Sequence, residues 1–406
     1  MSAPVVAPGR TGFPLFPLLL LSGAIFVSVT SEFLPTGLLP DMAADLRVSE
    51  SRVGLLVTVF AATVVLSTAP LAVLTRHLSR KWLMVGLLAA FAVSNVFAAI
   101  APTYETLVAA RILGGLAHGL FWAVTGPYAS HLVQKGQLAR ALSVTNAGGT
   151  LAFIIGVPVG TAIGQALGWR LSFLVMAGVV LVFTALIIAF LPPVKHLEDL
   201  RTGEIRLPAR KDKTVGAVMV VAVAVILVLT GHNLLYTYIA PWLIDIASFS
   251  PDAVPGLLFA YGVAGAVGLL LAGIFGDRFP RASVTVFLLG VMGAVLLLTA
   301  SASVPWLVVL SLVLWSASFG GLPSMMHARN LHRASHNIRD LASAWLTTAF
   351  NIGIGGGALL GGILLDGFGL TILPWGLIAL VALGLVFVLV TDARDAANAK
   401  ASAGTL

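Results

Sequence analysis

Three ionisable side chains lie inside long apolar stretches of this chain, where a charge needs a chemical reason. Glu32 lies in the first apolar stretch, nine residues or roughly 13 Å along a helix from Asp41. Arg111 and His118 are seven residues apart in another stretch, so a helix would present both on one face. Arg111 is about 12 Å in from the start of its stretch, which predicts the same depth as Glu32. An acid and a base at the same depth could form an ion pair or take part in proton transfer.

Two interpretations of Glu32 and Arg111 follow from this placement. In the first, a fixed ion pair makes each charge tolerable in apolar surroundings. In the second, the pairing is broken and remade as Glu32 takes up and releases a proton, because its partner and its hydration change between two conformations. His118 could relay protons or bind a ligand, although a lone histidine in a cavity is more often a hydrogen-bonding group.

The composition is that of a membrane protein. Of 406 residues, 59% are hydrophobic and only 10% are charged, and the mean hydropathy is +1.03. There is no cysteine, which excludes disulfides, thiolate metal sites and cysteine nucleophiles. The net charge of +7 could suggest a nucleic-acid partner, but the basic residues are spread between apolar runs and form no cluster. The first apolar run is too long for a signal peptide and is predicted to be a membrane helix.

Twelve apolar runs are long enough to cross a hydrocarbon core of about 30 Å. They lie near 14–40, 53–74, 82–101, 104–129, 139–166, 170–191, 214–242, 255–276, 282–301, 304–327, 340–365 and 370–391. All lysines and arginines except Arg47, Arg52, Arg111 and Arg170 fall on one side, which predicts cytoplasmic termini. The predicted units are a tail 1–13, a bundle of six helices 14–191, a cytoplasmic linker 192–213, a second bundle of six 214–391 and a tail 392–406.

The chain repeats itself, since Pro40 matches Pro241 and Gly156 matches Gly357 at the same offset of 201 residues. Two parallel six-helix halves, an all-α membrane architecture, are the symmetry described for major facilitator transporters, with the site between the halves near mid-membrane. The same shift places neutral residues opposite the three ionisable ones: Asn233 opposite Glu32, Leu312 opposite Arg111 and Phe319 opposite His118. Charge handling is therefore predicted to belong to the N-terminal half.

The C-terminal half offers an amphipathic set of side chains for the predicted cavity. Such a lining suits a small uncharged molecule with hydroxyl groups or an aromatic ring. For any one of these side chains, packing in the core or in the interfacial aromatic belt is an equal alternative. The predicted cavity residues are Thr36, Trp122, Asn233, Tyr236, Tyr238, Trp315, Phe319 and Asn351.

Glycines recur at every fourth position in two corresponding helices. Small residues at this spacing let helix backbones approach closely in lipid, and plain helix packing is the favoured explanation. The functional alternative is a surface that rocks against the opposite half, with a proline as a local bend. The residues of this predicted interface are Gly149, Gly156, Pro158, Gly160, Gly353, Gly357 and Gly361.

Two turns on the predicted cytoplasmic side carry bases that positive-inside topology alone would explain. The acid Asp277 suggests in addition a salt-bridged latch that holds helix ends together in one state and opens in the other. The predicted latch residues are Arg80, Lys81, Asp277, Arg278 and Arg281. Three histidines near a third turn, His327, His332 and His336, lie among arginines that repel a cation, so we expect no metal site there.

Several of these motifs resemble those of the twelve-helix drug:proton antiporters of the major facilitator superfamily, and the resemblance covers nearly the whole chain. The motif Asp277-Arg278-Phe279-Pro280-Arg281 is similar to the family's motif after helix 8, whereas the copy after helix 2 has Arg76 where the family usually has Asp. The stretch from Leu107 to Gly119 is similar to the arginine motif of helix 4, and Gly149 to Gly160 to the helix 5 motif associated with antiporters.

Other segments look most like the subgroup of sugar efflux transporters and chloramphenicol exporters. These are Thr30-Ser31-Glu32-Phe33, Ala117 to Trp122, Tyr236 to Pro241 and Phe350 to Ala358. The resemblance implies that Glu32 and Arg111 couple proton flow in a monomeric exporter of the inner membrane. The substrate would be a small amphipathic molecule, sugar-like or an antibiotic such as chloramphenicol.

Alternatives stay open at this point. An uptake permease or facilitator could use the same fold, and a receptor that transports nothing is a third class. An enzyme is disfavoured because HExxH, GxSxG and a close pair of intramembrane carboxylates are all missing from the sequence. We expect no cofactor other than the coupling proton, no nucleic-acid partner, and the lipid bilayer and a small solute as partners.

Overall fold

The computed structural model describes residues 13–194 and 212–403, and every regular element in these ranges is a helix. By length and composition, twelve helices or helix pairs could cross a membrane, as the apolar runs predict. The first eight α-helices are α1 Leu15–Gly37, α2 Leu39–Leu46, α3 Glu50–Leu74, α4 Arg80–Ile100, α5 Tyr104–Leu132, α6 Leu138–Leu151, α7 Val157–Leu167 and α8 Trp169–Phe190. The rest are α9 Val215–Tyr236, α10 Ile239–Pro241, α11 Val254–Arg278, α12 Pro280–Ala300, α13 Pro305–Phe319, α14 Leu322–Arg333, α15 Arg339–Phe368 and α16 Leu373–Ala403.

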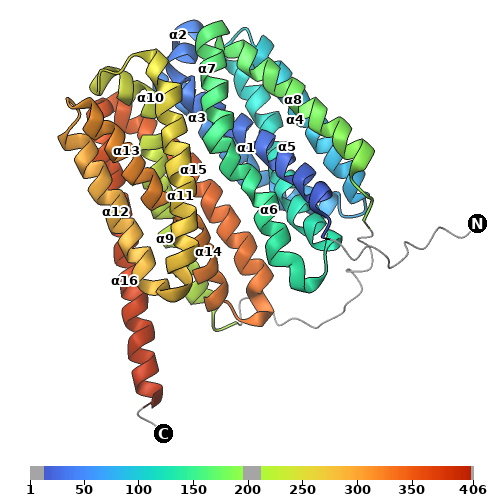
Figure 1. Cartoon of the computed structure of the whole chain (residues 1–406), viewed down its shortest axis with the longest axis vertical. Helices are drawn as coiled ribbons and strands as arrows, with labels where there is room; N and C mark the ends of the chain where they lie inside the picture. Colours follow the sequence, from blue (N-terminus) through green and yellow to red (C-terminus); the bar gives the residue numbers. More distant parts are fainter. Residues whose placement is uncertain (1–12, 195–211, 404–406) are drawn as a thin grey trace, which may run out of the picture.

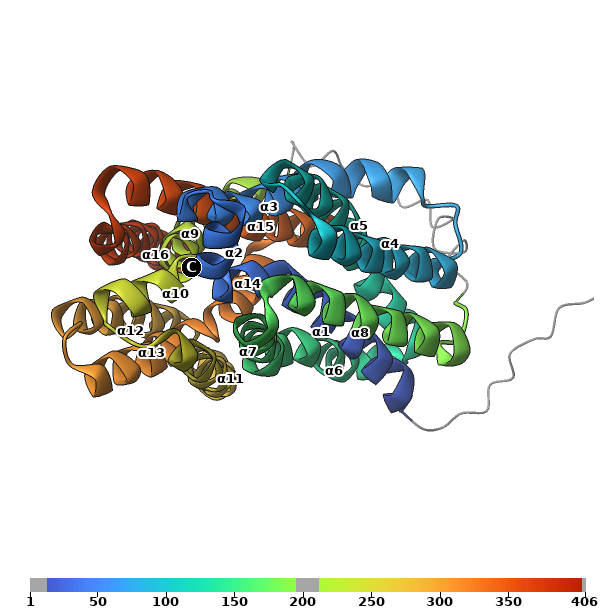
Figure 2. The same cartoon turned by 90° about the horizontal axis from the view of Figure 1, so that it is seen from above.

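The helices gather in two groups that follow the sequence. Helices α1 to α8, blue to green, lie on one side of the molecule, and α9 to α16, yellow to red, lie on the other (Figures 1 and 2). We call them the N-terminal and C-terminal halves. The end of the molecule that carries α2 is the α2 end, and the opposite end, where α8 stops and α9 starts, is the linker end. The predicted tail 1–13 and linker 192–213 lie mostly outside the described residues, so their boundaries stay predictions.

Four of the predicted spans are interrupted: 214–242 breaks between α9 and α10, and the other three break near a glycine or a proline. The first span ends at Gly37 and restarts as the short helix α2. The fifth contains a π-helical turn from Ala152 to Gly156, which ends two residues before Pro158; the missing N–H of this proline weakens the α-helical ladder there. The tenth breaks between α13 and α14 at Gly320 and Gly321. The local bend that we predicted at Pro158 is thus a π turn.

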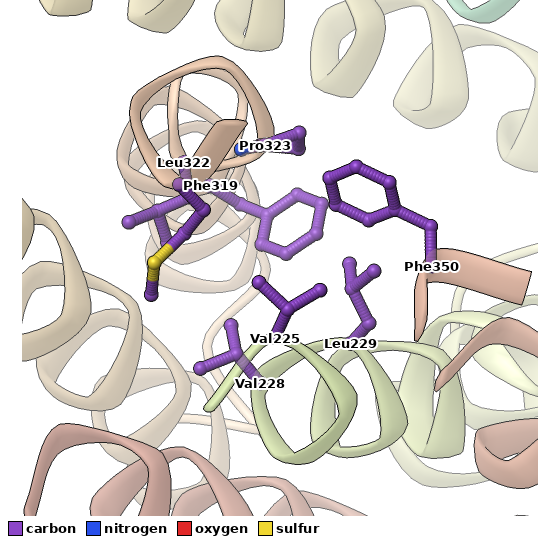
Figure 3. A pocket seen from close by; sticks show the side chains of 8 residues that line it. Val225, Val228, Leu229, Phe319, Leu322, Pro323 and Phe350 are labelled. Atoms are coloured by element: carbon purple, nitrogen blue, oxygen red, sulfur yellow. The ribbon is translucent and has the colours of Figure 1, made fainter. Parts of the chain in front are cut away.

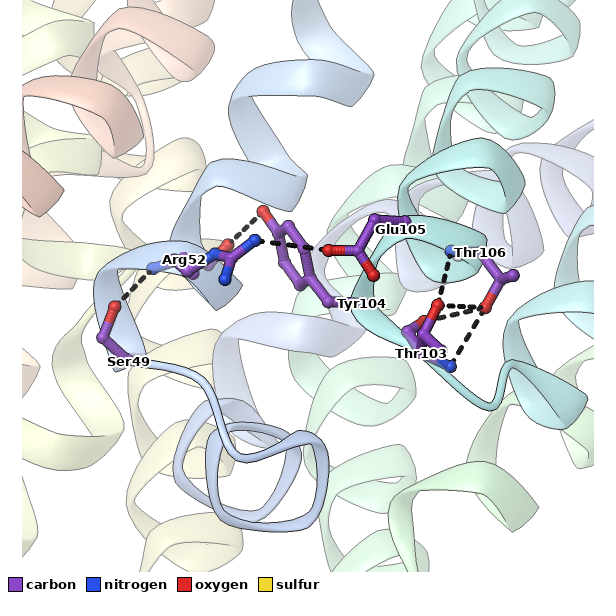
Figure 4. Close-up of polar contacts among 6 residues, drawn as sticks. All are labelled: Ser49, Arg52, Thr103, Tyr104, Glu105 and Thr106. Carbon is purple, nitrogen blue, oxygen red and sulfur yellow. Dashed lines mark hydrogen bonds and ion pairs between the residues drawn. The ribbon is translucent and has the colours of Figure 1, made fainter.

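Polar side chains fasten the helix ends at the α2 end (Figure 4). Ser49 caps α3 by accepting a hydrogen bond from the backbone N–H of Arg52. Arg52 lies 4.5 Å from the centre of the Tyr104 ring and 3.4 Å from a Glu105 oxygen, and the Tyr104 hydroxyl donates to the Arg52 carbonyl. Thr103 forms a capping box at the start of α5. These contacts set the spacing of α3 and α5.

Ion pairs and caps fasten the linker end of the C-terminal half. Arg329 of α14 lies 2.5 Å from a carboxylate oxygen of Asp392 in α16, and Arg333 is 3.7 Å from the same oxygen. Asp212 accepts hydrogen bonds from Ser335 and Thr214, which lower the pKa of its carboxyl to about 2. The start of α9 is thereby tied to the turn before α15.

The two glycine ridges pack within their own halves. A Cβ atom at Gly156 or Gly160 would collide with Thr30 or Leu34 of α1, and Gly149 is also nearest to α1. Likewise Gly353, Gly357 and Gly361 face α9. The favoured explanation, close helix packing, thus describes these glycines, and the rocking of the two helices against the opposite half stays a prediction.

Other residues make the contacts between the halves. A Cβ at Gly262 of α11 would meet the backbone of Phe153, and one at Gly355 of α15 would meet Ala61 of α3. The Thr58 hydroxyl donates to the Gly355 carbonyl at 2.9 Å. Towards the α2 end, Gly54 of α3 lies against the Tyr238 hydroxyl group. The halves thus touch along α3 and α15 and along the π turn and α11.

Candidate functional site

The N-terminal half holds its three ionisable groups together in the interior. Glu32, Arg111 and His118 are each at most 4% exposed. Arg111 donates to the backbone carbonyls of Ser31 at 2.9 Å and Glu32 at 2.8 Å, and its guanidinium lies 4.3 Å from the centre of the Phe60 ring. The Glu32 carboxylate lies 3.5 Å from Nε2 of His118. The three residues that we predicted for proton handling therefore lie at one place.

The pairing differs from the ion pair that the sequence predicts between Glu32 and Arg111. Pro35 in α1 has no N–H, so the Ser31 carbonyl, four residues earlier, lacks its helical donor. Arg111 supplies that donor, since a guanidinium can donate several parallel hydrogen bonds. The arginine is thus anchored to the backbone of α1, and the carboxylate is left beside the His118 imidazole.

Neutral polar side chains complete this N-terminal cluster. Ser28 Oγ and His118 Nδ1 are 2.9 Å apart, and the Ser31 hydroxyl donates to Asn95 of α4 at 2.9 Å. Asn95 is 1% exposed. Sequence reasoning missed Ser28, Ser31 and Asn95. Ser28 lies one helical turn before Glu32, so helical spacing could have indicated it.

The C-terminal half has an aromatic cluster at the corresponding place. His232 of α9 lies between two rings: its centre is 3.4 Å from that of Phe319, with the planes parallel to within 3°, and 5.3 Å from that of Tyr236. Trp315 of α13 lies edge-on to the imidazole, with ring centres 5.3 Å apart. Tyr261 of α11 is 5.2 Å from Tyr236. The structure thus gathers three predicted cavity residues around two that the sequence analysis missed.

A signal for His232 was present in the sequence. It is a histidine in the apolar helix α9, directly before Asn233, which we had selected. It is 5% exposed, and its Nδ1 has no hydrogen-bond partner among the described residues. The indole Nε1 of Trp315 likewise has none. Buried polar atoms without partners are rare and mark a place where a ligand or water can bind.

The other predicted cavity residues have separate roles. Asn233 donates to the Leu229 carbonyl of its own helix, and Asn351 donates to the Thr347 carbonyl of its own. The Tyr238 hydroxyl donates to the Ala358 carbonyl, so this fully buried side chain joins the break between α9 and α10 to α15, and its place in the cavity stays a prediction. Trp122 packs its half-buried ring on His118, with centres 6.1 Å apart. Thr36 is buried, and its hydroxyl has no partner among the described residues.

An aromatic bridge links the clusters of the two halves. Phe33, the neighbour of Glu32, lies 4.9 Å from Phe153 of the π turn and 6.4 Å from Tyr236, measured between ring centres. Phe153 is also 6.2 Å from Tyr236. Phe33 and Phe153 thus bring the N-terminal half into contact with the aromatic cluster of the C-terminal half.

The predicted latch residues lie apart from both clusters. Lys81 donates to the Ile188 carbonyl near the end of α8, Arg278 lies 5.4 Å from the Phe279 ring, and Arg281 is exposed. Arg80 is half-buried. The Asp277 side chain lies outside the described residues, so the latch stays a prediction.

Of the three histidines near the turn before α15, two contact neutral groups: His327 lies near the Ser343 hydroxyl, and His332 lies near the Ala328 carbonyl. His336 is exposed.

The model of the Major Facilitator Superfamily matches residues 21–250 and 221–405 of this chain. A relative called probable sugar efflux transporter, from Helicobacter pylori, is 33% identical over 359 residues, which cover 88% of this chain and 90% of the relative. A protein of the same name from Helicobacter acinonychis is 32% identical over 356 residues, with the same coverage of both chains.

Solved structures share the fold at low sequence identity. The nucleoside transporter NupG has a TM-score of 0.74 and 14% identity, and the match covers 94% of this chain and 99% of that one. A bacterial homologue of the human lysosomal transporter Spinster, in an inward-facing and unoccupied conformation, has a TM-score of 0.66 and 15% identity, with 93% and 96% covered.

Proposed function

Because the chain belongs to the major facilitator superfamily, we propose that it is a proton-coupled antiporter that exports a small amphipathic molecule by alternating access. The names of its relatives support export of a sugar-like solute, and the aromatic cluster of the C-terminal half also suits an antibiotic such as chloramphenicol. We place it in the inner membrane as a monomer, and the distribution of lysines and arginines favours a cytoplasmic linker end.

One observation carries the proton coupling: the buried Glu32 carboxylate lies beside His118 while Arg111 is bound to the backbone. An ionised carboxylate in a membrane interior is costly, on the order of 3 kcal/mol on insertion scales. Because Arg111 already satisfies two carbonyls, it lowers this cost only through its nearby charge. Glu32 can then gain or lose a proton without the rupture of a direct ion pair.

The proposed cycle uses the two clusters in turn. With the linker end accessible, solute reaches the C-terminal cluster, and packing through Phe33 and Tyr236 favours release of the Glu32 proton into the cytoplasm. The loaded carrier then opens at the α2 end by parting the contacts of Gly54 and Gly262. Solute leaves there, Glu32 takes up a proton from outside, and the carrier returns. His118 and Ser28 orient the carboxylate throughout.

The decisive experiment measures efflux from proteoliposomes driven by a pH gradient, with Glu32→Gln compared with the wild type. The glutamine has the same shape and cannot release a proton, so we expect gradient-driven efflux to fall at least 100-fold while solute counterflow continues. Asp41→Asn is the matched control, because Asp41 is exposed. Undiminished gradient-driven efflux by Glu32→Gln would contradict the proposal.

The same vesicles separate export by antiport from the alternatives. A facilitator or uptake permease would show counterflow that is indifferent to the pH gradient, or solute movement in the direction of proton flow. A receptor would show neither counterflow nor proton release when solute binds. Proton release from the purified protein on addition of solute, absent in Glu32→Gln, is the result that we expect.

A further inference from the structure

His232 has no part in the proton coupling proposed above, yet it lies at the centre of the C-terminal cluster. Val225, Leu229, His232 and Tyr236 follow one another at helical spacing, so they form one stripe along α9. The upper part of the stripe reaches Tyr236 and the bridge to Phe33. Its lower part, nearer the linker end, lines a pocket. His232 therefore lies between the pocket and the N-terminal cluster.

The Phe319 ring covers the imidazole in an unusual arrangement. The two rings are parallel to within 3° with their centres only 3.4 Å apart, a direct face-to-face stack. Aromatic pairs prefer offset or edge-to-face geometries, so this stack contributes little beyond the area it buries. Phe319 is the last residue of α13 and precedes the break at Gly320 and Gly321, and it is only half-buried. Both features favour displacement of the ring.

Phe319 also lines an apolar pocket (Figure 3). Phe350 of α15 faces the Phe319 ring across it, Val225 and Leu229 lie below, and Leu322 and Pro323 of α14 lie beside it. The pocket is small and partly open, with a cavity volume of about 10 Å³, so a ligand ring needs the space that Phe319 now fills. All the residues that line it are apolar, so a charged solute has no counter-charge there. Phe319 thus both lines this pocket and covers one face of the His232 imidazole.

We infer that His232 binds the solute, and that the Phe319 ring occupies the place of a planar ring of an uncharged, hydroxyl-bearing ligand. When Phe319 swings aside, the ligand ring stacks on the imidazole and a ligand hydroxyl binds Nδ1. A hydroxyl fits either tautomer of the histidine, because it both donates and accepts hydrogen bonds. The unpartnered Nε1–H of Trp315 can donate to a second ligand oxygen. The inference rests on the proposed function in so far as the ligand is the transported solute.

Two glycosides of equal hydroxyl content provide the test. Phenyl β-D-glucoside carries a planar ring and cyclohexyl β-D-glucoside a puckered one of similar size. Binding to the purified full-length protein in detergent is measured by titration calorimetry at one pH, with no gradient. We expect the phenyl compound to bind about fivefold more tightly, in line with the contribution of aromatic pairs beyond buried area. Equal affinities, or no binding of either compound, would overturn the inference.

Three variants locate the effect. His232→Leu removes both the ring and the nitrogen, so the preference for the phenyl compound should disappear. His232→Phe keeps a ring without the nitrogen, so the preference should persist while both affinities fall about fivefold, the worth of one hydrogen bond. Phe319→Leu removes the competing ring and should tighten phenyl glucoside binding about threefold, a gain that misfolding cannot produce.

Phe350→Leu is the matched control, because Phe350 lines the same pocket and is not stacked on His232. It should change both affinities by the same factor. An unaltered preference in His232→Leu, or no gain in Phe319→Leu, would refute the assignment of His232 as a ligand-binding residue. These binding measurements use no proton gradient, so they do not depend on proton coupling. If the expected binding preferences are found but efflux does not respond to a pH gradient, the antiport proposal fails and the assignment of His232 stands.

Discussion

Where the N-terminal half carries Glu32 and Arg111, the C-terminal half carries Asn233 and Leu312 at the repeat-related positions. The ring that packs on each cluster also differs. Phe60 lies under the Arg111 guanidinium, whereas its counterpart Tyr261 packs edge-on against Trp315, with ring centres 5.3 Å apart. One helical arrangement thus supports an ionisable cluster in one half and an aromatic cluster in the other.

This difference separates the two tasks of the proposed transporter. A proton carrier needs a buried acid with polar neighbours, and a solute site needs rings and a few unpartnered polar atoms. The clusters do not overlap, but Phe33 and Tyr236 bring them into contact. Substitutions that exchange chemistry between the halves are therefore the sharpest way to challenge the comparison.

The largest effect, on stability, is expected from Arg111→Leu, which introduces the leucine found at the repeat-related position Leu312. Arg111 makes two buried hydrogen bonds to carbonyls of α1. Loss of both should lower the free energy of unfolding by about 3 kcal/mol or more, since bonds to charged groups contribute 1.5–3 kcal/mol each. Thermal unfolding of the purified protein measures the change.

Arg111→Lys is the control for this prediction. A lysine keeps the charge but lacks the planar fork that donates to the Ser31 and Glu32 carbonyls together, so its stability should be intermediate. If Arg111→Leu unfolds at the same temperature as the wild type, the hydrogen bonds from Arg111 to α1 do not stabilise the N-terminal half, and the prediction is contradicted.

A smaller effect is expected at His118, whose counterpart is Phe319. His118→Phe removes the contacts with Ser28 and Glu32, so gradient-driven efflux should fall about tenfold while counterflow changes less than about twofold. His118→Gln keeps an amide beside Glu32 and should retain most of the coupling. If His118→Gln is as inactive as Glu32→Gln, His118 itself carries the proton.

The smallest effect is expected at Asp45, which forms hydrogen bonds at the α2 end of the N-terminal half. Asp45 accepts hydrogen bonds from Arg170 and Trp169, whereas Ile246 takes its place in the repeat. The bond from Arg170, chiefly, holds the pKa of Asp45 below its usual range. Because folding lowers this pKa, the ionised Asp45 stabilises the folded protein fully at a pH above its pKa in the unfolded chain, about 3.9. This stabilisation is lost as the pH falls through the pKa that Asp45 has in the folded protein.

Because the Asp45 side chain is 46% exposed, solvent screening limits this contribution to about 1 kcal/mol. Thermal unfolding between pH 3 and pH 6 should show the wild type losing its advantage over Asp45→Asn at the acid end. A constant difference between the two proteins over that range would exclude the predicted linkage.

Much of the fold follows from the sequence because it depends on local composition. Twelve apolar runs of bilayer length predict twelve spans, and charges such as Glu32 and Arg111 inside them mark a functional place. Helix breaks at Gly320 and before Pro158 also have local causes. Residue spacing did not predict which neighbouring helix packs against the glycines of each ridge. This depends on the orientation of α6, α7 and α15 about their own axes in the folded protein.

The sequence by itself predicted a common depth for Glu32 and Arg111 and one helical face for Arg111 and His118, because helical geometry converts residue spacing into distance and direction. It also determined that their counterparts are neutral. Only the tertiary structure decided the partners: Pro35 frees a carbonyl that Arg111 takes, which leaves Glu32 beside His118. Likewise, only the packing of α9 against α13 places Phe319 on His232. Partner choice depends on side-chain direction across separate helices, which no spacing along one helix encodes.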